Sequence, residues 1–247
     1  MLPSCETHGV NPNRPPVLIL CGGRGTRLRS GSRSLPKPLV EIGGMPVVWH
    51  VIQIYAAQGF TDFRLLTGHR AEEIEAFASV IEWPEGVSVS CVFTGDDTPT
   101  GGRVQRAVAG GVGPVCVTYA DGVADLDLGA LLDFHRSSGA QATVTVVQPE
   151  LPFGVAQMSG DRIVGFEEKP QSTEWINGGF MVLEEAAQAV IGPDDILERA
   201  PFERLAAAGD LAGYRHEGFW FCMDTYKDQV ALNDLWEDGS APWRNWT

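Results

Sequence analysis

The sequence predicts an α/β fold: a doubly wound, mostly parallel sheet joined to a smaller β-rich lobe. Short apolar runs alternate with amphipathic stretches through the first 150 residues, which is typical of consecutive βα units. The chain has 247 residues, 44% of them hydrophobic, which is enough to bury a full core. After residue 150 the pattern changes to short strands and tight turns, which indicates a lobe of a different kind.

In the first half, each expected strand is a short apolar run, and each expected helix repeats apolar residues every three or four positions. The helix over 46–58, for example, places Val47, Val51 and Ile54 on one face. The expected elements are, in order, strand 17–21, helix 46–58, strand 63–67, helix 71–80, strand 87–93, helix 102–109, strand 115–119, helix 126–138 and strand 143–147. Since helices separate the strands, we expect the strands to run parallel.

The second half begins with a predicted hairpin, because the runs 154–158 and 162–167 flank the turn sequence Ser159-Gly160-Asp161. The elements expected after it are strand 178–183, helix 200–208, strand 211–215 and helix 227–236. We expect residues 17–247 to form a single domain with halves at about 17–150 and 151–247. Residues 1–16 hold four prolines and lack the apolar core of a signal peptide, so we expect a flexible leader.

The overall composition excludes several functional classes. A formal net charge of −14 argues against nucleic-acid binding, which favours a broad basic surface. No run of 18 apolar residues is present, so we expect no membrane span. The five cysteines are scattered without a CxxC pair, which supports neither a disulfide framework nor a zinc site and favours a cytoplasmic protein.

The most informative segment is the glycine-rich stretch Leu20–Leu28, followed by Leu35–Pro38. Its glycines leave backbone N–H groups accessible to a ligand. No acidic residue occurs between Glu6 and Glu41, and the basic residues in that interval are Arg14, Arg24, Arg27, Arg29, Arg33 and Lys37. The segment matches neither the dinucleotide fingerprint nor the Walker A loop. It therefore predicts a site for a small anion; the alternative is a surface loop with solvated arginines.

Two aspartates are candidate ligands for a cation. Asp121 directly follows the apolar run 115–119, so it is expected at the same sheet edge as the glycine-rich segment. A carboxylate beside phosphate groups is repelled unless a divalent cation lies between them, and Mg²⁺ commonly binds one or two carboxylates plus phosphate oxygens. Asp224 follows another apolar segment; capping of the next helix is the alternative for it, while Asp125 or Asp127 is expected to cap helix 126–138.

The motif G-G-x-G-T-R-L, followed by P-K-P, resembles the signature of the sugar-1-phosphate nucleotidyltransferases. The resemblance extends from Val17 to Trp246 and is closest to the glucose-1-phosphate cytidylyltransferase subgroup. The strings that carry it are residues 39–44, 49–50, 100–103, 121–125, 218–220, 223–225, 235–236 and 241–243. It implies a Rossmann-like nucleotidyltransferase fold. One departure is Trp220-Phe221-Cys222, which lacks a glutamine common near the sugar in that subgroup.

The resemblance also implies site residues. The catalytic residues would be Arg27, Lys37, Asp121 and Asp224. The nucleotide would be bound by Leu20, Gly22, Gly23, Gly25, Thr26, Arg27, Lys37, Gly102, Arg103 and Asp121. The sugar phosphate would be bound by Gly154, Glu168, Lys169, Asn177 and Gly178. Asp121 and Asp224 would share Mg²⁺, and the pairing of these two aspartates rests on the resemblance alone.

The expected reaction transfers a cytidylyl group from CTP to α-D-glucose 1-phosphate or a close hexose 1-phosphate, with release of pyrophosphate. Two alternatives stay open: transfer of a thymidylyl, uridylyl or guanylyl group to another sugar phosphate, or a non-catalytic protein that binds nucleotide sugars. The expected partners are these small molecules, with neither nucleic acid nor membrane, and we expect the chain to form a homo-oligomer.

Overall fold

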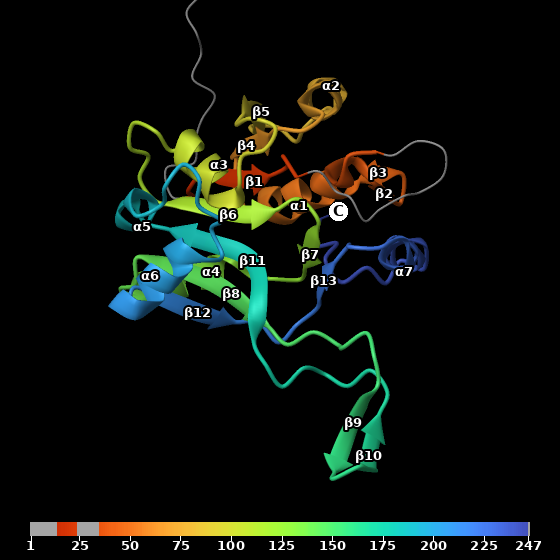
Figure 1. Cartoon of the computed structure of the whole chain (residues 1–247). Coiled ribbons are helices and arrows are strands. Elements are labelled where there is room, and N and C mark those ends of the chain that lie inside the picture. The colour runs from red at the N-terminus through yellow and green to blue at the C-terminus, as the bar shows by residue number, and fades with distance from the viewer. Residues whose placement is uncertain (1–13, 24–34, 247) are drawn as a thin grey trace, which may run out of the picture.

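The structure is a computed structural model, and it describes residues 14–23 and 35–246. Its centre is a seven-stranded sheet in the order β12-β8-β11-β6-β1-β4-β5, with helices on both faces (Figure 1). The strands of this sheet are β1 (Val17–Leu20), β4 (Asp62–Thr67), β5 (Ser88–Phe93), β6 (Val115–Tyr119), β8 (Ala142–Val147), β11 (Ile176–Leu183) and β12 (Leu211–Arg215).

Three two-stranded ribbons accompany this sheet. They pair β2 (Glu41–Ile42) with β3 (Met45–Pro46), β7 (Gly122–Ala124) with β13 (Trp220–Cys222), and β9 (Val155–Ser159) with β10 (Arg162–Glu167). The helices are the 3₁₀ turn η1 (Lys37–Leu39), α1 (Val47–Ala56), α2 (Ala71–Val80), α3 (Thr100–Ala107), α4 (Leu128–Ser138), α5 (Glu185–Ala189), α6 (Ala200–Ala208) and α7 (Tyr226–Glu237).

The predicted mostly parallel, doubly wound sheet is confirmed. Six strands run in one direction, and only β11 runs against them, antiparallel to both β6 and β8. One face of the sheet packs on α1, α2 and α4, and the other packs on α3, α5 and α6. Alternate residues of β1 show this division, because Ile19 belongs to the first cluster and Leu18 to the second.

The predicted helices and strands are present in the structure, with bounds that differ by at most a few residues. Six short elements were not predicted: η1, β2, β3, β7, β13 and α5. Their runs of two to five residues are too short to show a period, and tertiary pairing forms them. The proposed cap of α4 is confirmed for Asp127, whose carboxylate accepts a hydrogen bond from the backbone N–H of Ala130 at 2.8 Å.

His50 lies at the centre of an aromatic cluster that holds the C-terminal segment on α1. The side chain is fully buried, and its ring packs edge-on against Trp49 and Trp236. Its Nε2 donates to the carbonyl of Ile42 at 2.8 Å, and its Nδ1 accepts from the indole N–H of Trp243 at 3.4 Å. Both ring nitrogens are therefore satisfied in the neutral form. Burial then lowers the pKa of His50 to about 4.

This arrangement predicts acid destabilisation of the fold. Between pH 6.5 and about 4, the unfolded chain protonates His50 while the folded chain does not, so stability falls as the pH falls through this window. The full effect is about 3 kcal/mol. Urea unfolding at pH 7 and pH 4.5 should show a smaller difference for His50→Gln than for the wild-type chain. The control His69→Gln should keep the wild-type difference; an unchanged difference in His50→Gln would contradict the assignment.

Candidate active site

The glycine-rich segment and Asp121 meet at one edge of the sheet. Leu20, the last residue of β1, pairs in register with Tyr119, the last residue of β6. The residues that follow these strands line one small pocket of about 80 Å³, formed by Leu20, Cys21, Gly23, Lys37, Pro38, Ala120 and Asp121. The prediction that the two segments are neighbours is confirmed.

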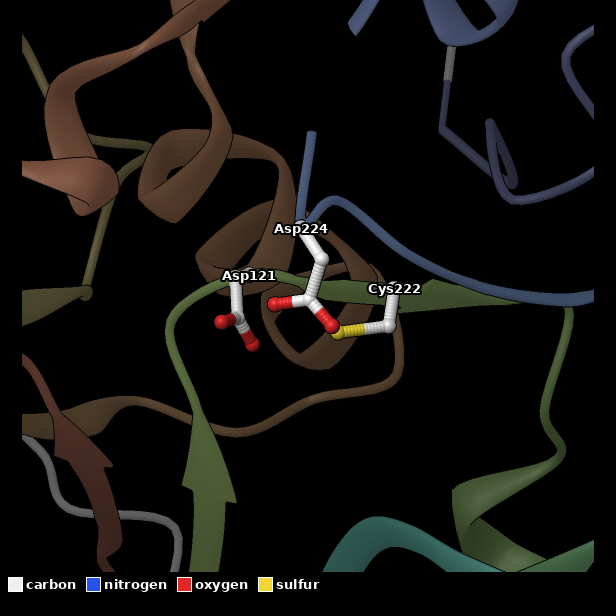
Figure 2. A group of neighbouring side chains, drawn as sticks. All are labelled: Asp121, Cys222 and Asp224. Atoms are coloured by element: carbon white, nitrogen blue, oxygen red, sulfur yellow. The ribbon is translucent and has the colours of Figure 1, made fainter. Parts of the chain in front are cut away.

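The ribbon of β7 and β13 brings the second aspartate to this edge. Cys222 of β13 pairs with Gly122 of β7, and the N–H of Met223 donates to the carbonyl of Asp121 at 2.9 Å. Asp224 follows two residues after Cys222, so extended backbone turns both side chains to the same side. Figure 2 shows the carboxyl groups of Asp121 and Asp224 and the Cys222 sulfur gathered together.

Lys37 connects the two aspartates. Its ammonium nitrogen lies 2.5 Å from a carboxylate oxygen of Asp121 and 2.5 Å from one of Asp224. The Lys37 side chain is 17% exposed, whereas that of Asp224 is 49% exposed. Burial alone would lower the pKa of Lys37, but the charge of Asp121 and hydrogen bonds to both aspartates raise it above its ordinary value. Lys37 is therefore held as a cation between the carboxylates.

Asp224 does not cap the helix that follows it. The cap of α7 is Thr225, whose hydroxyl accepts a hydrogen bond from the N–H of Asp228 in a capping box. The backbone N–H of Asp224 donates to the Asp228 carboxylate at 2.9 Å, which leaves the Asp224 carboxylate for Lys37. The alternative role for Asp224 as a helix cap is wrong.

The residues at this edge fit a divalent cation. The carboxylates of Asp121 and Asp224 and the thiol of Cys222 have donor atoms within 4.8 Å of one another. A positive group already lies between the carboxylates, since the Lys37 ammonium bonds to both. Sequence reasoning missed Cys222, although its position two residues before Asp224 in an extended segment could have indicated it. Burial, followed by the negative charges of Asp121 and Asp224, raises the pKa of its thiol.

Arg103 lies on α3 beneath the glycine-rich segment, and its side chain is 4% exposed. Its guanidinium donates five hydrogen bonds, to the carbonyl oxygens of Gly22, Thr67, Gly95 and Asp96 and to the hydroxyl of Thr94, at 2.6–3.2 Å. A Cβ on Gly22 would lie 2.1 Å from the guanidinium carbon, so a side chain at that position would push the guanidinium away from its hydrogen-bond partners. Arg103 therefore supports the backbone at Gly22, within the part of the glycine-rich segment that the structure describes.

Removal of this guanidinium should destabilise the chain strongly. Arg103→Met keeps much of the side-chain volume but leaves several buried acceptors without a donor, at about 1–3 kcal/mol each. We expect a loss of at least about 3 kcal/mol in the free energy of unfolding, measured by urea denaturation. Arg136→Met, which loses only an exposed ion pair with Asp133, should change stability by less than about 1 kcal/mol. Equal stability of the two variants would contradict the supporting role of Arg103.

Gly102, the neighbour of Arg103, lets α3 pack closely against the loop that contains Pro193. A Cβ at this position would lie 2.0 Å from the carbonyl oxygen of Pro193. Gly101 is similar, because a Cβ there would lie 2.6 Å from the carbonyl oxygen of Asp195. The start of α3 thus lies directly against the 192–195 loop.

Tyr119 joins α3 to the second half of the chain. Its hydroxyl donates to the carboxylate of Glu198 and accepts from the amide of Asn177 at 3.0 Å. Glu198 also accepts from the hydroxyl of Thr100, at the start of α3, at 2.7 Å. Asn177, a candidate sugar-phosphate ligand, is thus connected through two side chains to the helix that supports the glycine-rich segment. Gly178, its neighbour, accepts the indole N–H of Trp220 at 2.8 Å.

The other sugar-phosphate candidates lie at the base of the β9–β10 hairpin, which projects away from the sheet (Figure 1). Gly154 and Glu168 are adjacent there, since a Cβ on Gly154 would lie 2.8 Å from a Glu168 carboxylate oxygen. Lys169 is exposed and has a left-handed backbone with φ of 47°. Within residues 14–23 and 35–246, no hydrogen bond or ion pair joins Glu168 or Lys169 to Lys37, Asp121 or Asp224.

A larger pocket of about 650 Å³ opens beside Trp220, at the ends of β8 and β12. It is lined by residues 147–150, 171–173, Trp175 and 216–220. Aromatic faces and polar side chains thus surround it together.

The predicted residues Gly25, Thr26 and Arg27 lie outside the residues that the structure describes. Among the described helices, none combines the length and the apolar character needed to cross a membrane.

Comparisons with known proteins show the family to which this chain is similar. A protein-family model described as "Nucleotidyl transferase" matches residues 16–206. The chain is 39% identical to the glucose-1-phosphate cytidylyltransferase of Salmonella typhi, over 93% of this chain and 99% of that protein. It is 32% identical to a mannose-1-phosphate guanyltransferase of Gibberella zeae, over 90% of this chain but 66% of that protein.

Among solved structures, HddC from Yersinia pseudotuberculosis, complexed with GMP-PN, matches with a TM-score of 0.69. The match covers 90% of this chain and 99% of HddC at 20% sequence identity, so it shows a shared fold.

Proposed function

Because the chain belongs to the nucleotidyl transferase family, we propose that it transfers the cytidylyl group of CTP to α-D-glucose 1-phosphate. The products are CDP-glucose and pyrophosphate. The observation that carries this proposal is the 39% identity to the Salmonella cytidylyltransferase along 99% of that enzyme's length. The match to the guanyltransferase is weaker and spans only two thirds of its length, so guanylyl transfer is less well supported.

The chemistry needs positioning and charge neutralisation more than proton transfer. The phosphate oxygen of glucose 1-phosphate forms a bond to the α-phosphorus of CTP, and the bond from that phosphorus to the bridging oxygen breaks. The nucleophile is already an anion, so no general base is required. Catalysis of this kind relies on holding the reactants in line and stabilising the negative charge of the phosphates.

The proposed roles of Arg27, Lys37 and Lys169 are those that the family resemblance implies. Lys37 binds the α-phosphate of CTP, Arg27 binds the leaving pyrophosphate, and Lys169 fixes the phosphate of the sugar. The backbone of Leu20, Gly22 and Gly23 approaches the nucleotide, supported from below by Arg103. An open space beside Gly23, where a Cβ would meet no atom within 4 Å, supports this placement.

We propose Mg²⁺ as the metal, held by Asp121 and Asp224. Two carboxylates plus phosphate oxygens are a typical ligand set for this ion, and the bound ion would offset phosphate charge at the reacting centre. Lys37 bonds both carboxylates here, so it must move towards the nucleotide when a metal binds. The ammonium is on a flexible stem, which suits such a movement.

The second half would bind the sugar phosphate through Gly154, Glu168, Lys169, Asn177 and Gly178. The pocket beside Trp220 is large enough to admit a hexose phosphate next to Gly178. We also propose that residues 17–150 form the nucleotide half and residues 151–247 the sugar half of one domain, acting in the cytoplasm as a homo-oligomer. The exposed apolar side chains of the β9–β10 hairpin support self-association.

Pyrophosphate release tests this function directly. The purified chain is assayed with Mg²⁺ against CTP, dTTP, UTP and GTP, each combined with the 1-phosphates of glucose, mannose and galactose. We expect the highest kcat/KM for CTP with glucose 1-phosphate. A higher value for another pair would replace the assignment by that pair. CTP binding without pyrophosphate release in any combination would favour the non-catalytic alternative.

A further inference from the structure

The pairing of β13 with β7 places the thiol of Cys222 beside the carboxylates of Asp121 and Asp224. In the β7–β13 ribbon, Cys222 pairs with Gly122, the residue after Asp121. Cys222 and Asp224 are two residues apart in an extended segment, so their side chains point to the same side. The sulfur and one oxygen from each carboxylate lie within 4.8 Å of one another (Figure 2). The Cys222 residue is only partly buried.

This donor set differs chemically from a site of two carboxylates alone. Carboxylate oxygens suit hard cations such as Mg²⁺, whereas a thiolate suits softer cations such as Zn²⁺ or Cd²⁺. Two carboxylates and one thiolate are a recognisable ligand set for such a cation, with an open position for water or phosphate. The two carboxylates attract a positive group, since they hold the Lys37 ammonium between them, and a metal ion would take its place.

We propose that Cys222 makes this cluster a high-affinity site for a thiophilic divalent cation, which binds Asp121, Asp224 and Cys222 and excludes the hard cation of the reaction. The proposal rests on the proposed function, since it takes the same two carboxylates as the metal ligands. On binding, the thiol proton leaves to solvent and a metal–sulfur bond forms, so one proton is released for each cation bound by the thiol. Thiophilic cations would therefore regulate this enzyme by occupying its own metal site.

Cadmium alone is the probe, because a cadmium–thiolate bond gives a charge-transfer absorption band in the ultraviolet. CdCl₂ is titrated into the wild-type chain, Cys222→Ser and the matched control Cys91→Ser, with calorimetry in parallel. We expect the band in the wild-type chain and in Cys91→Ser, its loss in Cys222→Ser, and a Cd²⁺ affinity about tenfold or more lower in Cys222→Ser. A band that persists in Cys222→Ser, or none in the wild-type chain, would overturn the proposal.

Two further measurements separate the cluster from a lone thiol. Asp224→Asn keeps the sulfur but removes a carboxylate, so we expect its Cd²⁺ affinity to fall; an unchanged affinity would show binding by the thiol alone and overturn the proposal. If Cys222→Ser does not fold, ¹¹³Cd NMR of the wild-type chain decides, since the chemical shift of the bound ion reports whether sulfur is a ligand. A shift typical of oxygen ligands alone would contradict the proposal.

The two proposals fail in different ways. A wild-type chain that shows the sulfur band but releases no pyrophosphate with Mg²⁺ would refute the proposed reaction and leave the thiophilic site standing. A chain that releases pyrophosphate with Mg²⁺ but shows no sulfur band would keep the reaction and refute the role of Cys222. Competition completes the test: Mg²⁺ added in modest excess should leave the band unchanged, and loss of the band at equimolar Mg²⁺ would overturn the proposal.

Discussion

Asp121→Asn and Asp224→Asn are each expected to reduce turnover by about a hundredfold or more and to weaken binding of Mg²⁺. Each substitution removes one negative charge while keeping the shape of the side chain. The Lys37 ammonium bonds both carboxylates at 2.5 Å, so the two aspartates act on one centre and not as separate surface charges. Pyrophosphate release measured across a range of Mg²⁺ concentrations gives both effects in one experiment.

The matched control for these variants is Asp133→Asn on α4, whose side chain is 78% exposed and pairs only with Arg136 among the described residues. It should keep wild-type turnover and Mg²⁺ dependence. Near-normal turnover of Asp224→Asn at limiting Mg²⁺ would refute the metal assignment. Thermal unfolding of all three variants checks that lost activity does not come from lost structure.

Lys37→Ala is expected to lower turnover by a similar factor but with the opposite effect on the metal. In the structure the ammonium occupies the space between the carboxylates, so it competes with any cation that binds there. Without it, Mg²⁺ should bind at least as tightly as in the wild-type chain, while the α-phosphate of CTP loses its positive partner. Calorimetric titration with Mg²⁺, alongside turnover at saturating Mg²⁺, measures the two effects separately.

Lys227→Ala on α7 is the control for this variant, because Lys227 is an exposed lysine only three residues after Asp224 in the chain. It should leave both quantities unchanged. Weaker Mg²⁺ binding in Lys37→Ala would mean that Lys37 helps to build the metal site instead of competing with the metal. Unchanged turnover would remove Lys37 from the reaction altogether.

Most of the sheet could be predicted from the sequence, because its strands are buried apolar runs separated by helices with a clear period. Val115–Tyr119 and Ala71–Val80 show this directly, since their predicted bounds match the structure. The reversed direction of β11 could not be predicted. Strand direction depends on where the preceding connection leads, and the long excursion through the β9–β10 hairpin leaves that open.

Part of the candidate site could likewise be predicted from the sequence, and part could not. The neighbourhood of the glycine-rich segment and Asp121 follows from parallel strands that end at one edge, so it needs no tertiary information. The approach of Asp224 to Asp121 depends on two three-residue strands, β7 and β13, that pair over a long separation in sequence. Nothing local marks such strands, and only the family resemblance paired these aspartates.

Arg103 shows a different gap between sequence and structure. The family resemblance implied that Arg103 contacts the nucleotide, and a structural role was the alternative. The structure provides five acceptors for its guanidinium from the surrounding backbone and Thr94, and no sequence period indicates that such acceptors converge. Contact with the nucleotide stays a prediction, and support of Gly22 is what the described residues display.

The reversed strand β11 also sets an order of assembly during synthesis. Strands β1, β4, β5 and β6 are consecutive neighbours in one half of the sheet. This half can therefore form once residue 119 has left the ribosome. Strand β8, at 142–147, reaches β6 only through β11, at 176–183. Strand β8 therefore stays without its β11 partner in the nascent chain until residues 176–183 have been synthesised. A chaperone that binds short apolar segments would find residues 142–147 available during that interval.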